Sequence, residues 1–349
     1  MTALSKKVKI GNIIVGGGEP IKIQSMTTTR LSDISSSVKS ALDLEKAGCE
    51  IVRFSVLDEN DAKSIALVKK SLSIPLVADI HFDYRLALSS IENGADKIRI
   101  NPGNIGSDDK VRKVAEALKR TGVPVRVGSN TGSIEKEFLD KYGRTEKALA
   151  ESALKHVSTL EKHGVENIVI SVKASSVPLM VKAYRYIAER TNYPLHLGVT
   201  EAGTEYNGII KNSLGIGALL LDGIGDTIRV SLSADPVREV VAAKAILKGL
   251  DLIKGGAEVI ACPTCGRCEW DCMAFAKKTE DYLSGVTKPI KVAVMGCVVN
   301  GPGEASDADV GIAGSKDKAV IFVGGKILKT VNLEDAEREF FSEIDKCIR

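Results

Sequence analysis

Aromatic residues are scarce in this chain of 349 residues: they make up 4% of the sequence and include a single tryptophan. A core built from this composition must therefore be mainly aliphatic. Long apolar runs are lacking too. The longest, "LGIGALLLDGIG", is broken by glycine and aspartate and falls short of the roughly 18–20 residues that a membrane span needs. The beginning, "MTALSKKVKIG", has no apolar signal region, so we expect a cytoplasmic protein that inserts into no membrane.

A strong excess of one charge is also absent. The net charge of +3 is too small to predict a nucleic-acid partner. The sequence shows neither a dinucleotide-binding fingerprint nor another flavin or nicotinamide motif. In a reducing compartment, its seven cysteines are expected to bind metal or to act in redox chemistry rather than to form disulfides.

The first two thirds of the chain alternate short apolar, β-branched runs with amphipathic helical stretches. Eight such runs, each followed by a helix, over roughly 200–240 residues predict an α/β fold of the (β/α)8 TIM-barrel type. An open doubly wound sheet is the alternative, but it lacks its usual fingerprint. The predicted strands are residues 20–26, 50–56, 75–81, 97–103, 124–130, 167–173, 195–203 and 227–233.

The pattern changes after about residue 250. Short β-like runs at residues 258–263, 290–296, 309–314 and 319–328 are separated by glycine-rich turns and by most of the cysteines. We therefore predict two domains, a TIM barrel over residues 1–250 and a smaller α+β domain over residues 251–349.

Polar and cationic residues gather at the C-terminal ends of the predicted barrel strands, where the active sites of such barrels lie. Several arginines converging with amides and hydroxyls predict a site for a phosphate or diphosphate, because the guanidinium fork suits phosphate oxygens. In the alternative interpretation, half of these side chains point outward and are solvated. The candidates are Arg53, Arg99, Asn101, Arg126, Asn130, Lys173, Arg229 and Ser231.

Carboxylates are few at the same strand ends, with only Asp79 and Glu201 and with His81 nearby. A magnesium-dependent phosphate site would usually supply more of them, so direct binding of the anion by arginines is favoured. His156 and His163 lie in a polar helical stretch and are expected at the surface.

Five cysteines lie in two stretches, "ACPTCGRCEWDC" and "MGCVVNGPGE". The spacing of Cys262, Cys265, Cys268 and Cys272 matches an iron–sulfur site of bacterial ferredoxins, with Met273 in place of the usual proline and with Cys297 left over. A zinc site is the alternative, although zinc ribbons usually present two separated CxxC pairs.

These motifs resemble those of the 4-hydroxy-3-methylbut-2-en-1-yl diphosphate synthase family, which works in the methylerythritol phosphate route to isoprenoids. The resemblance rests on "CPTCGR" and "GCVVNGPGE", and it extends through "IQSMT", "ADIHFD", "KIRINPGN", "VRVGSN", "SVKAS", "GVTEAG" and "RVSLSADP". It spans essentially the whole chain, in the short two-domain form of the family.

The resemblance implies a [4Fe–4S] cluster held by Cys262, Cys265, Cys297 and Glu304, with Cys268 and Cys272 as bystanders. A hard carboxylate is a poor partner for a soft cluster, so Glu304 could leave and open one iron to substrate. The implied reaction reduces 2-C-methyl-D-erythritol 2,4-cyclodiphosphate with two electrons and loss of water. For the proton we expect Glu201, with Asp79 and His81 as orienting groups.

The resemblance also implies partners. A ferredoxin or flavodoxin is expected as the electron donor, and a homodimer in which the barrel of one subunit faces the cluster domain of the other. Two alternatives from other classes are a zinc-stapled TIM-barrel transferase or lyase acting on a phosphorylated ligand, and a non-enzymatic iron–sulfur sensor.

Overall fold

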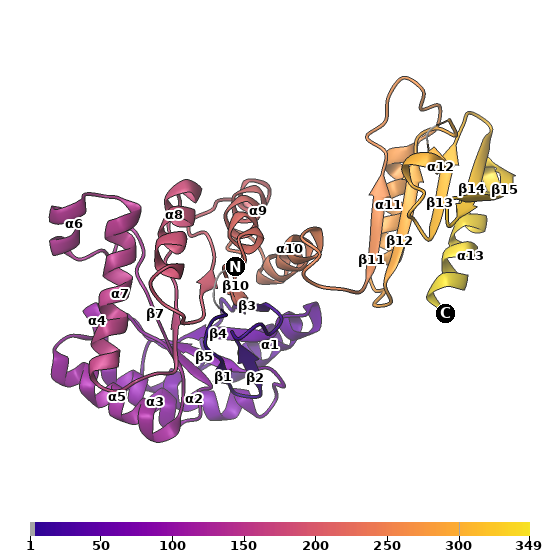
Figure 1. Ribbon diagram of the computed structural model, residues 1–349. Coiled ribbons are helices and arrows are strands. Elements are labelled where there is room, and N and C mark those ends of the chain that lie inside the picture. Colours follow the sequence, from indigo (N-terminus) through magenta and orange to yellow (C-terminus); the bar gives the residue numbers. More distant parts are fainter. Residues whose placement is uncertain (1–3, 300) are drawn as a thin grey trace. The chain divides into compact units, whose positions relative to one another are not determined.

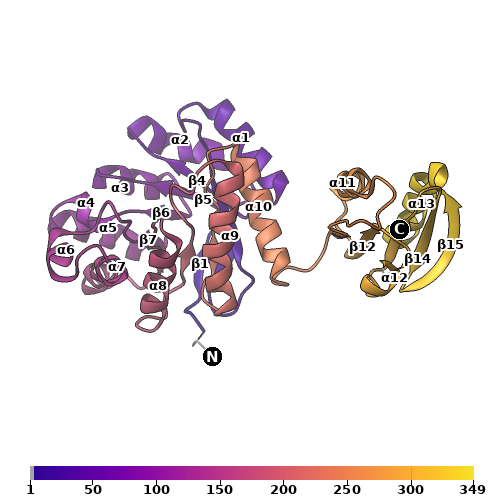
Figure 2. The same cartoon turned by 90° about the horizontal axis from the view of Figure 1, so that it is seen from above.

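A computed structural model describes residues 4–299 and 301–349 and divides the chain into two compact units (Figures 1 and 2). The first unit ends at Ile253, and the second spans Lys254–Arg349. Over the two described ranges, no helix combines the length and the apolar character that a bilayer crossing requires.

The first unit is a parallel barrel of eight strands, which confirms the predicted fold class. The strands pair in the order β8-β7-β6-β5-β4-β3-β10-β9, and a bridge between Ile170 and Leu195 brings β8 beside β9. Each predicted run contains one strand, although most strands end before the run does. Their bounds are β3 (Lys22–Met26), β4 (Ile51–Ser55), β5 (Leu76–Asp79), β6 (Lys97–Arg99), β7 (Val125–Val127), β8 (Ile168–Ile170), β9 (His196–Leu197) and β10 (Thr227–Ile228).

Helices surround this barrel, as Figure 2 shows from above. Several begin at an aspartate whose side chain accepts a backbone N–H of the first turn, such as Asp33 and Asp58. Among these helices, α1 and α5 end at a glycine in the left-handed αL conformation, Gly48 and Gly122. Their bounds are α1 (Ile34–Ala47), α2 (Glu59–Lys69), α3 (Tyr84–Glu92), α4 (Pro102–Ile105), α5 (Asp108–Thr121), α6 (Lys136–Tyr142), α7 (Glu146–Lys162), α8 (Val177–Ala188), α9 (Glu205–Leu221) and α10 (Pro236–Gly249).

A hairpin that the sequence analysis did not predict precedes the barrel. Its strands, β1 (Val8–Ile10) and β2 (Ile13–Val15), pack Val8, Ile10 and Val15 against an apolar cluster from β4, β5 and β8. The Asn12 side chain donates to the Ser73 carbonyl, just before β5. The hairpin therefore covers the N-terminal ends of the barrel strands, opposite the end where the predicted site lies.

The core is mainly aliphatic, as the composition predicted, and among the described residues of the barrel Phe54 and Tyr184 are the aromatic ones that belong to its largest fully buried side chains. The prediction for His156 was wrong, because this residue is 2% exposed. It lies on the face of α7 that packs inward with Ala153 and Val157, and its ring contacts the carboxylate of Glu135 at 2.7 Å. Small neighbours on that face leave room for a buried imidazole.

The second unit is a mixed five-stranded sheet in the order β11-β12-β13-β14-β15, with the first three strands parallel and the last two antiparallel. It holds most of the ring contacts between aromatic residues, among them those of Trp270, Phe275 and Phe340. The bounds are β11 (Ala257–Ala261), α11 (Cys272–Leu283), β12 (Ile290–Met295), α12 (Gly301–Glu304), β13 (Val310–Gly314), β14 (Lys318–Val323), β15 (Lys326–Asn332), η1 (Leu333–Asp335) and α13 (Ala336–Ile348).

Candidate active site

A polar cavity opens at the C-terminal ends of the barrel strands. Five arginine and lysine side chains face it, and Asp79 is the carboxylate among its lining residues. The lining residues are Arg53, Asp79, His81, Arg99, Arg126, Gly128, Ser129, Asn130, Ser171, Lys173, Thr200, Arg229 and Ser231. Such an excess of positive charge in a confined cavity favours an anionic ligand.

Asp79 neutralises part of this charge. Its carboxylate lies 3.5 Å from Arg53 Nε and 3.2 Å from Arg99 Nη1, and the residue is 2% exposed. Burial alone would raise the pKa of Asp79, but the charges of Arg53 and Arg99 outweigh it and lower the pKa to about 2. Asp79 is therefore ionised at neutral pH and fixes the two arginines. The Met26 sulfur also accepts from Arg53, at 2.8 Å.

Arg126 and Lys173 differ from Arg53 and Arg99, since neither forms an ion pair with any described carboxylate. Burial, and then the charges of neighbouring arginines, hold the pKa of both groups well below its usual value. The Arg126 Nε atom is buried and has no hydrogen-bond partner in the described structure. A ligand with negatively charged oxygens would compensate both cations, since buried polar groups are normally satisfied.

Two predicted residues lie outside this lining. The Asn101 side chain accepts from the Gly103 N–H at 3.0 Å and so caps the short helix α4. Glu201 is exposed in the segment between β9 and α9, with a φ of 52°. All other predicted barrel residues line the cavity, because side chains two residues apart on a barrel strand share its inner face.

Glu239 was missed by the sequence analysis although it contacts this site. It lies in the first turn of α10 and forms an ion pair with Arg229 at 3.2 Å. In the sequence it looks like an acidic residue that complements a helix N-terminus, which many exposed glutamates do. No local signal indicates that its side chain points inward.

The cysteine-rich loop of the second unit begins directly after β11. The Cys262 N–H donates to the Val294 carbonyl at 2.9 Å, which continues the pairing with β12. A Cβ atom at Gly296 would lie 3.4 Å from the Cys262 sulfur and 3.1 Å from the Cys268 sulfur. The glycine therefore lets the backbone pass close to these two thiols, immediately before Cys297.

Cys272 differs from the other cysteines of this loop because it is 1% exposed. Its thiol donates to the Val294 carbonyl at 3.7 Å, within the hydrophobic core under α11. Burial, followed by the neighbouring Cys268 and Cys262, raises the pKa of Cys272 to about 12. It is thus a poor thiolate, whereas Cys265 is exposed and Cys262 and Cys297 are half-buried.

Arg267 connects the remaining predicted ligands. A hydrogen bond to Cys297, and then the charges of Cys265, Cys297 and Glu304, raise the pKa of Arg267. Thiolates are stabilised beside a cation, and they are the ligands of iron–sulfur clusters. No three described His, Cys, Asp or Glu side chains converge closely enough for a single metal ion. The thiol donors fit an iron–sulfur cluster, whose irons are held by cysteine thiolates.

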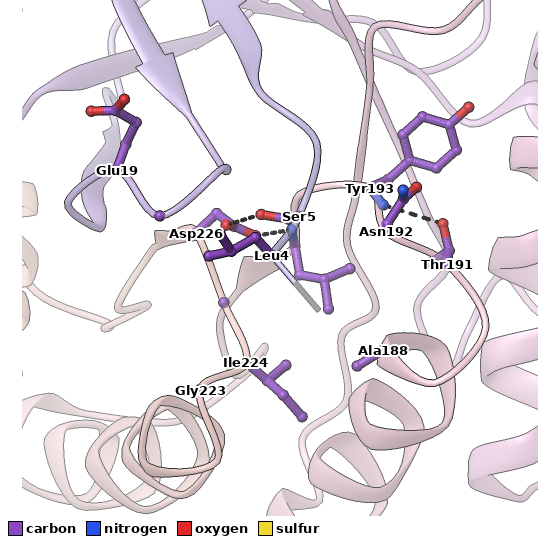
Figure 3. Close-up of a pocket in the computed structure, with 13 residues that line it drawn as sticks. Leu4, Ser5, Glu19, Ala188, Thr191, Asn192, Tyr193, Gly223, Ile224 and Asp226 are labelled. Carbon is purple, nitrogen blue, oxygen red and sulfur yellow. Dashed lines mark hydrogen bonds between the residues drawn. The ribbon is translucent and has the colours of Figure 1, made fainter. Parts of the chain in front are cut away.

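A second pocket lies at the opposite end of the barrel, near the N-terminal ends of β9 and β10 (Figure 3). Ser5 donates to one oxygen of Asp226 at 2.5 Å, and the Leu195 N–H donates to the other at 2.7 Å. Burial raises the pKa of Asp226. These contacts fasten the N-terminal segment to the barrel, and this end of such barrels serves stability.

Comparisons with known proteins agree along the whole chain. Residues 5–244 match the GcpE TIM-barrel domain, and residues 258–346 match the GcpE protein C-terminal domain. A protein of Caldanaerobacter subterraneus subsp. tengcongensis named 4-hydroxy-3-methylbut-2-en-1-yl diphosphate synthase (flavodoxin) is 55% identical over 350 residues, covering 100% of this chain and 99% of its own. A protein of the same name from Clostridium perfringens is 55% identical, covering 98% of each chain.

Solved structures show a more distant likeness. The dihydropteroate synthase of Xanthomonas albilineans is 12% identical, with a TM-score of 0.51 over 71% of this chain and 100% of its own. The N-acetylneuraminic acid (sialic acid) synthetase of Leptospira borgpetersenii is 14% identical, with a TM-score of 0.51 over 82% of this chain and 100% of its own. At such identities the likeness shows the barrel fold alone.

Proposed function

The chain belongs to the GcpE family, and we infer from this membership that it converts 2-C-methyl-D-erythritol 2,4-cyclodiphosphate into 4-hydroxy-3-methylbut-2-en-1-yl diphosphate. It is an oxidoreductase of isoprenoid biosynthesis. The conversion removes one oxygen from the substrate as water and opens the ring at a C–O bond. It therefore consumes two electrons from a donor and takes up protons.

The observation that carries this proposal is the cationic cavity of the barrel. Arg126 and Lys173 have no carboxylate partner among the described residues, and a cyclodiphosphate has negatively charged oxygens to compensate them. The barrel domain therefore binds the diphosphate. We assign this role to Arg53, Arg99, Asn101, Arg126, Asn130, Lys173, Arg229 and Ser231, with Asn101 acting through the loop that it caps.

The second domain is assigned a [4Fe–4S] cluster, held by Cys262, Cys265, Cys297 and Glu304. When bound, such a cluster supplies the two electrons one at a time. Support comes from the exposure of Cys265 and from the charge of Arg267 beside Cys297. Glu304 ends the short helix α12 and is exposed, and a hard carboxylate at such a position suits a replaceable ligand of a soft cluster.

Three residues are assigned to proton transfer and orientation. Asp79 stays ionised at neutral pH and orients Arg53 and Arg99, so it is unsuited to donate the proton. His81 lines the cavity two residues after the end of β5 and is assigned an orienting role. Glu201, exposed and in a left-handed backbone conformation, remains our candidate for the proton donor.

We further propose a flavodoxin or ferredoxin as electron donor, a homodimer, and a cytoplasmic location, without nucleic acid or membrane. The relatives named above carry flavodoxin in their names. Exposed apolar side chains recur every four residues along α9 at Tyr206, Ile210 and Leu214, which is typical of a helix that pairs with a second subunit.

The zinc-stapled transferase or lyase has no comparable support. Dihydropteroate synthases share the barrel at 12% identity, whereas the diphosphate synthases match both domains at 55%. The barrel fold hosts many activities, so this likeness carries no activity with it.

The deciding experiment determines iron, zinc and acid-labile sulfide in anaerobically purified protein and then assays the cyclodiphosphate with a reducing dye. We expect about four irons and four sulfides per chain and dehydration of the substrate. One zinc without sulfide, or a complete cluster without turnover, would contradict the proposal.

Three variants test the ligand assignment. Cys297→Ala should lose the cluster, whereas Glu304→Ala should keep part of it and lose most of the activity. Cys272→Ala is the matched control and should retain the cluster, since its thiol is buried and bonded to Val294. Loss of the cluster in Cys272→Ala would instead favour the ferredoxin-type set of four cysteines.

A further inference from the structure

Glu239 is a buried carboxylate that reaches the active site from outside the barrel wall. It belongs to α10, is 4% exposed, and does not line the cavity. Both of its oxygens are used. Oε2 accepts from Ser25 Oγ at 3.0 Å and from Arg229 Nε at 3.3 Å, while Oε1 accepts from Arg229 Nη2 at 3.2 Å and from the Leu232 N–H at 3.1 Å.

These four donors come from the place where the first and the last strand of the barrel pair, which we call the seam. Ser25 lies on β3, the first strand of the barrel, Arg229 follows β10, the last, and β3 pairs with β10. Leu232 belongs to the segment that leads from β10 to α10. Burying a carboxylate is costly unless donors satisfy it, so the four bonds hold this segment and the strand ends in one arrangement.

Arg229 is held along one edge of its guanidinium group. Nε and Nη2 both face Glu239, which is the two-point geometry that fixes an arginine most firmly. Within residues 4–299 and 301–349, no hydrogen bond involves the remaining Nη1 group. Since Arg229 lines the cavity, its other edge is directed to whatever binds there.

We propose that Glu239 is a positioning residue that presents Arg229 to the diphosphate of the substrate. Asp79 does the corresponding work for Arg53 and Arg99, but from within the cavity, where it also meets the ligand. Glu239 acts from behind the wall, and its hydrogen bonds among the described residues go to Ser25, Arg229 and Leu232. The proposal rests on the proposed function for the identity of the ligand.

The test measures the affinity of the oxidised holoenzyme for the cyclodiphosphate by calorimetry, without reductant, so that no turnover occurs. Glu239→Gln keeps the shape of the side chain and removes its charge. We expect the dissociation constant to rise about tenfold, the effect of losing one charge-assisted hydrogen bond. In turnover, the loss should appear mainly in KM, because Arg229 would contact the diphosphate in the ground state as well.

A double-mutant cycle separates positioning from a general effect on the fold. In the Arg229→Gln background, Glu239→Gln should weaken binding less than twofold, because its target is already gone. Additive losses in the cycle would overturn the proposal, and so would an unchanged affinity of Glu239→Gln alone.

Asp226→Asn provides the matched control. It also removes a multiply bonded carboxylate, half-buried in this case, at the opposite end of the barrel (Figure 3). It should lower the melting temperature and leave the dissociation constant unchanged. If Asp226→Asn weakens binding as much as Glu239→Gln, the effect is one of stability and the proposal is wrong.

Two further arms keep the test decisive. If Glu239→Gln does not fold, Glu239→Asp replaces it; its shorter side chain should still raise the dissociation constant, and wild-type affinity in that variant would refute the proposal. If the wild-type protein does not bind the cyclodiphosphate, the proposed function fails. The same cycle is then run with inorganic pyrophosphate, where non-additivity supports the role of Glu239 and additivity refutes it.

Discussion

Replacing Asp79 by asparagine removes the carboxylate that holds two arginines of the cavity. Arg53 and Arg99 lie within 3.5 Å of it, and Asp79 is 2% exposed. Asparagine has nearly the same shape, so packing around position 79 should change little. The variant therefore measures what one negative charge contributes among several buried cations.

The magnitude follows from the pKa of Asp79, which falls from an ordinary 3.8 to about 2 in the folded protein. Each pH unit of this difference corresponds to about 1.4 kcal/mol, so ionised Asp79 stabilises the fold by about 2.5 kcal/mol at neutral pH. Because the folded pKa is the lower one, this contribution is complete well above pH 3.8 and is lost as the pH falls towards 2. At pH 3 about half of it should remain.

The assay is urea denaturation of wild type and Asp79→Asn at pH 7 and at pH 3, followed by far-ultraviolet circular dichroism. Trp270, the single tryptophan, lies in the second unit, so its fluorescence reports that unit and serves as an internal control. The free energy of unfolding of the barrel should drop by about 2.5 kcal/mol at pH 7 and by about half as much at pH 3. The tryptophan transition should not shift.

Denaturation in the presence of added phosphate is a second test. The variant has one negative charge fewer in the cavity, so phosphate should stabilise it more than it stabilises the wild type. A loss below about 1 kcal/mol at pH 7, or a loss that is the same at pH 7 and pH 3, would refute the argument from paired charges.

Two other substitutions test buried groups of the barrel. Lys97 is fully buried and bonded only to Gln24 among the described residues, and burial lowers its pKa well below the usual value. The unfolded chain therefore keeps the Lys97 proton to a higher pH than the folded chain does, so the stability of the wild type rises with pH. In thermal melts from pH 7 to 10, wild type should gain stability relative to Lys97→Met, and parallel curves would contradict this. Gly128→Ala would place a Cβ 1.6 Å from the Ser171 carbonyl oxygen and should lower the free energy of unfolding by at least about 3 kcal/mol, measured by urea denaturation. As the control, a Cβ at Gly217 in α9 meets nothing within 4 Å, so Gly217→Ala should be neutral or stabilising.

The sequence predicted the barrel because its signals are local. Each strand is a short apolar run, and a residue such as Arg99 or Arg126 within it is conspicuous. Alternation along a strand then brings such side chains to one cavity without further information. The assignment of these residues and of the cluster ligands to a ligand stays a prediction, since it concerns molecules that bind to the chain.

Other features could not be predicted because they depend on packing between distant elements. Glu239 and His156 both lie in helices, where the face that is buried is set by neighbouring elements rather than by composition. Asn101 was expected in the cavity, but it serves as the cap of α4, since the strand before it ends at Arg99. Strand ends are the least certain part of such a prediction.

The hairpin β1–β2 has a consequence for the order of events in turnover. Val8, Ile10 and Val15 close the barrel at the N-terminal ends of its strands, so molecules reach the cavity through the other end. Substrate, product and the released water then share one passage. Under the proposed function, a new cyclodiphosphate then enters only after the product has left, and the product, which retains the diphosphate, would compete for the same cations at that exit.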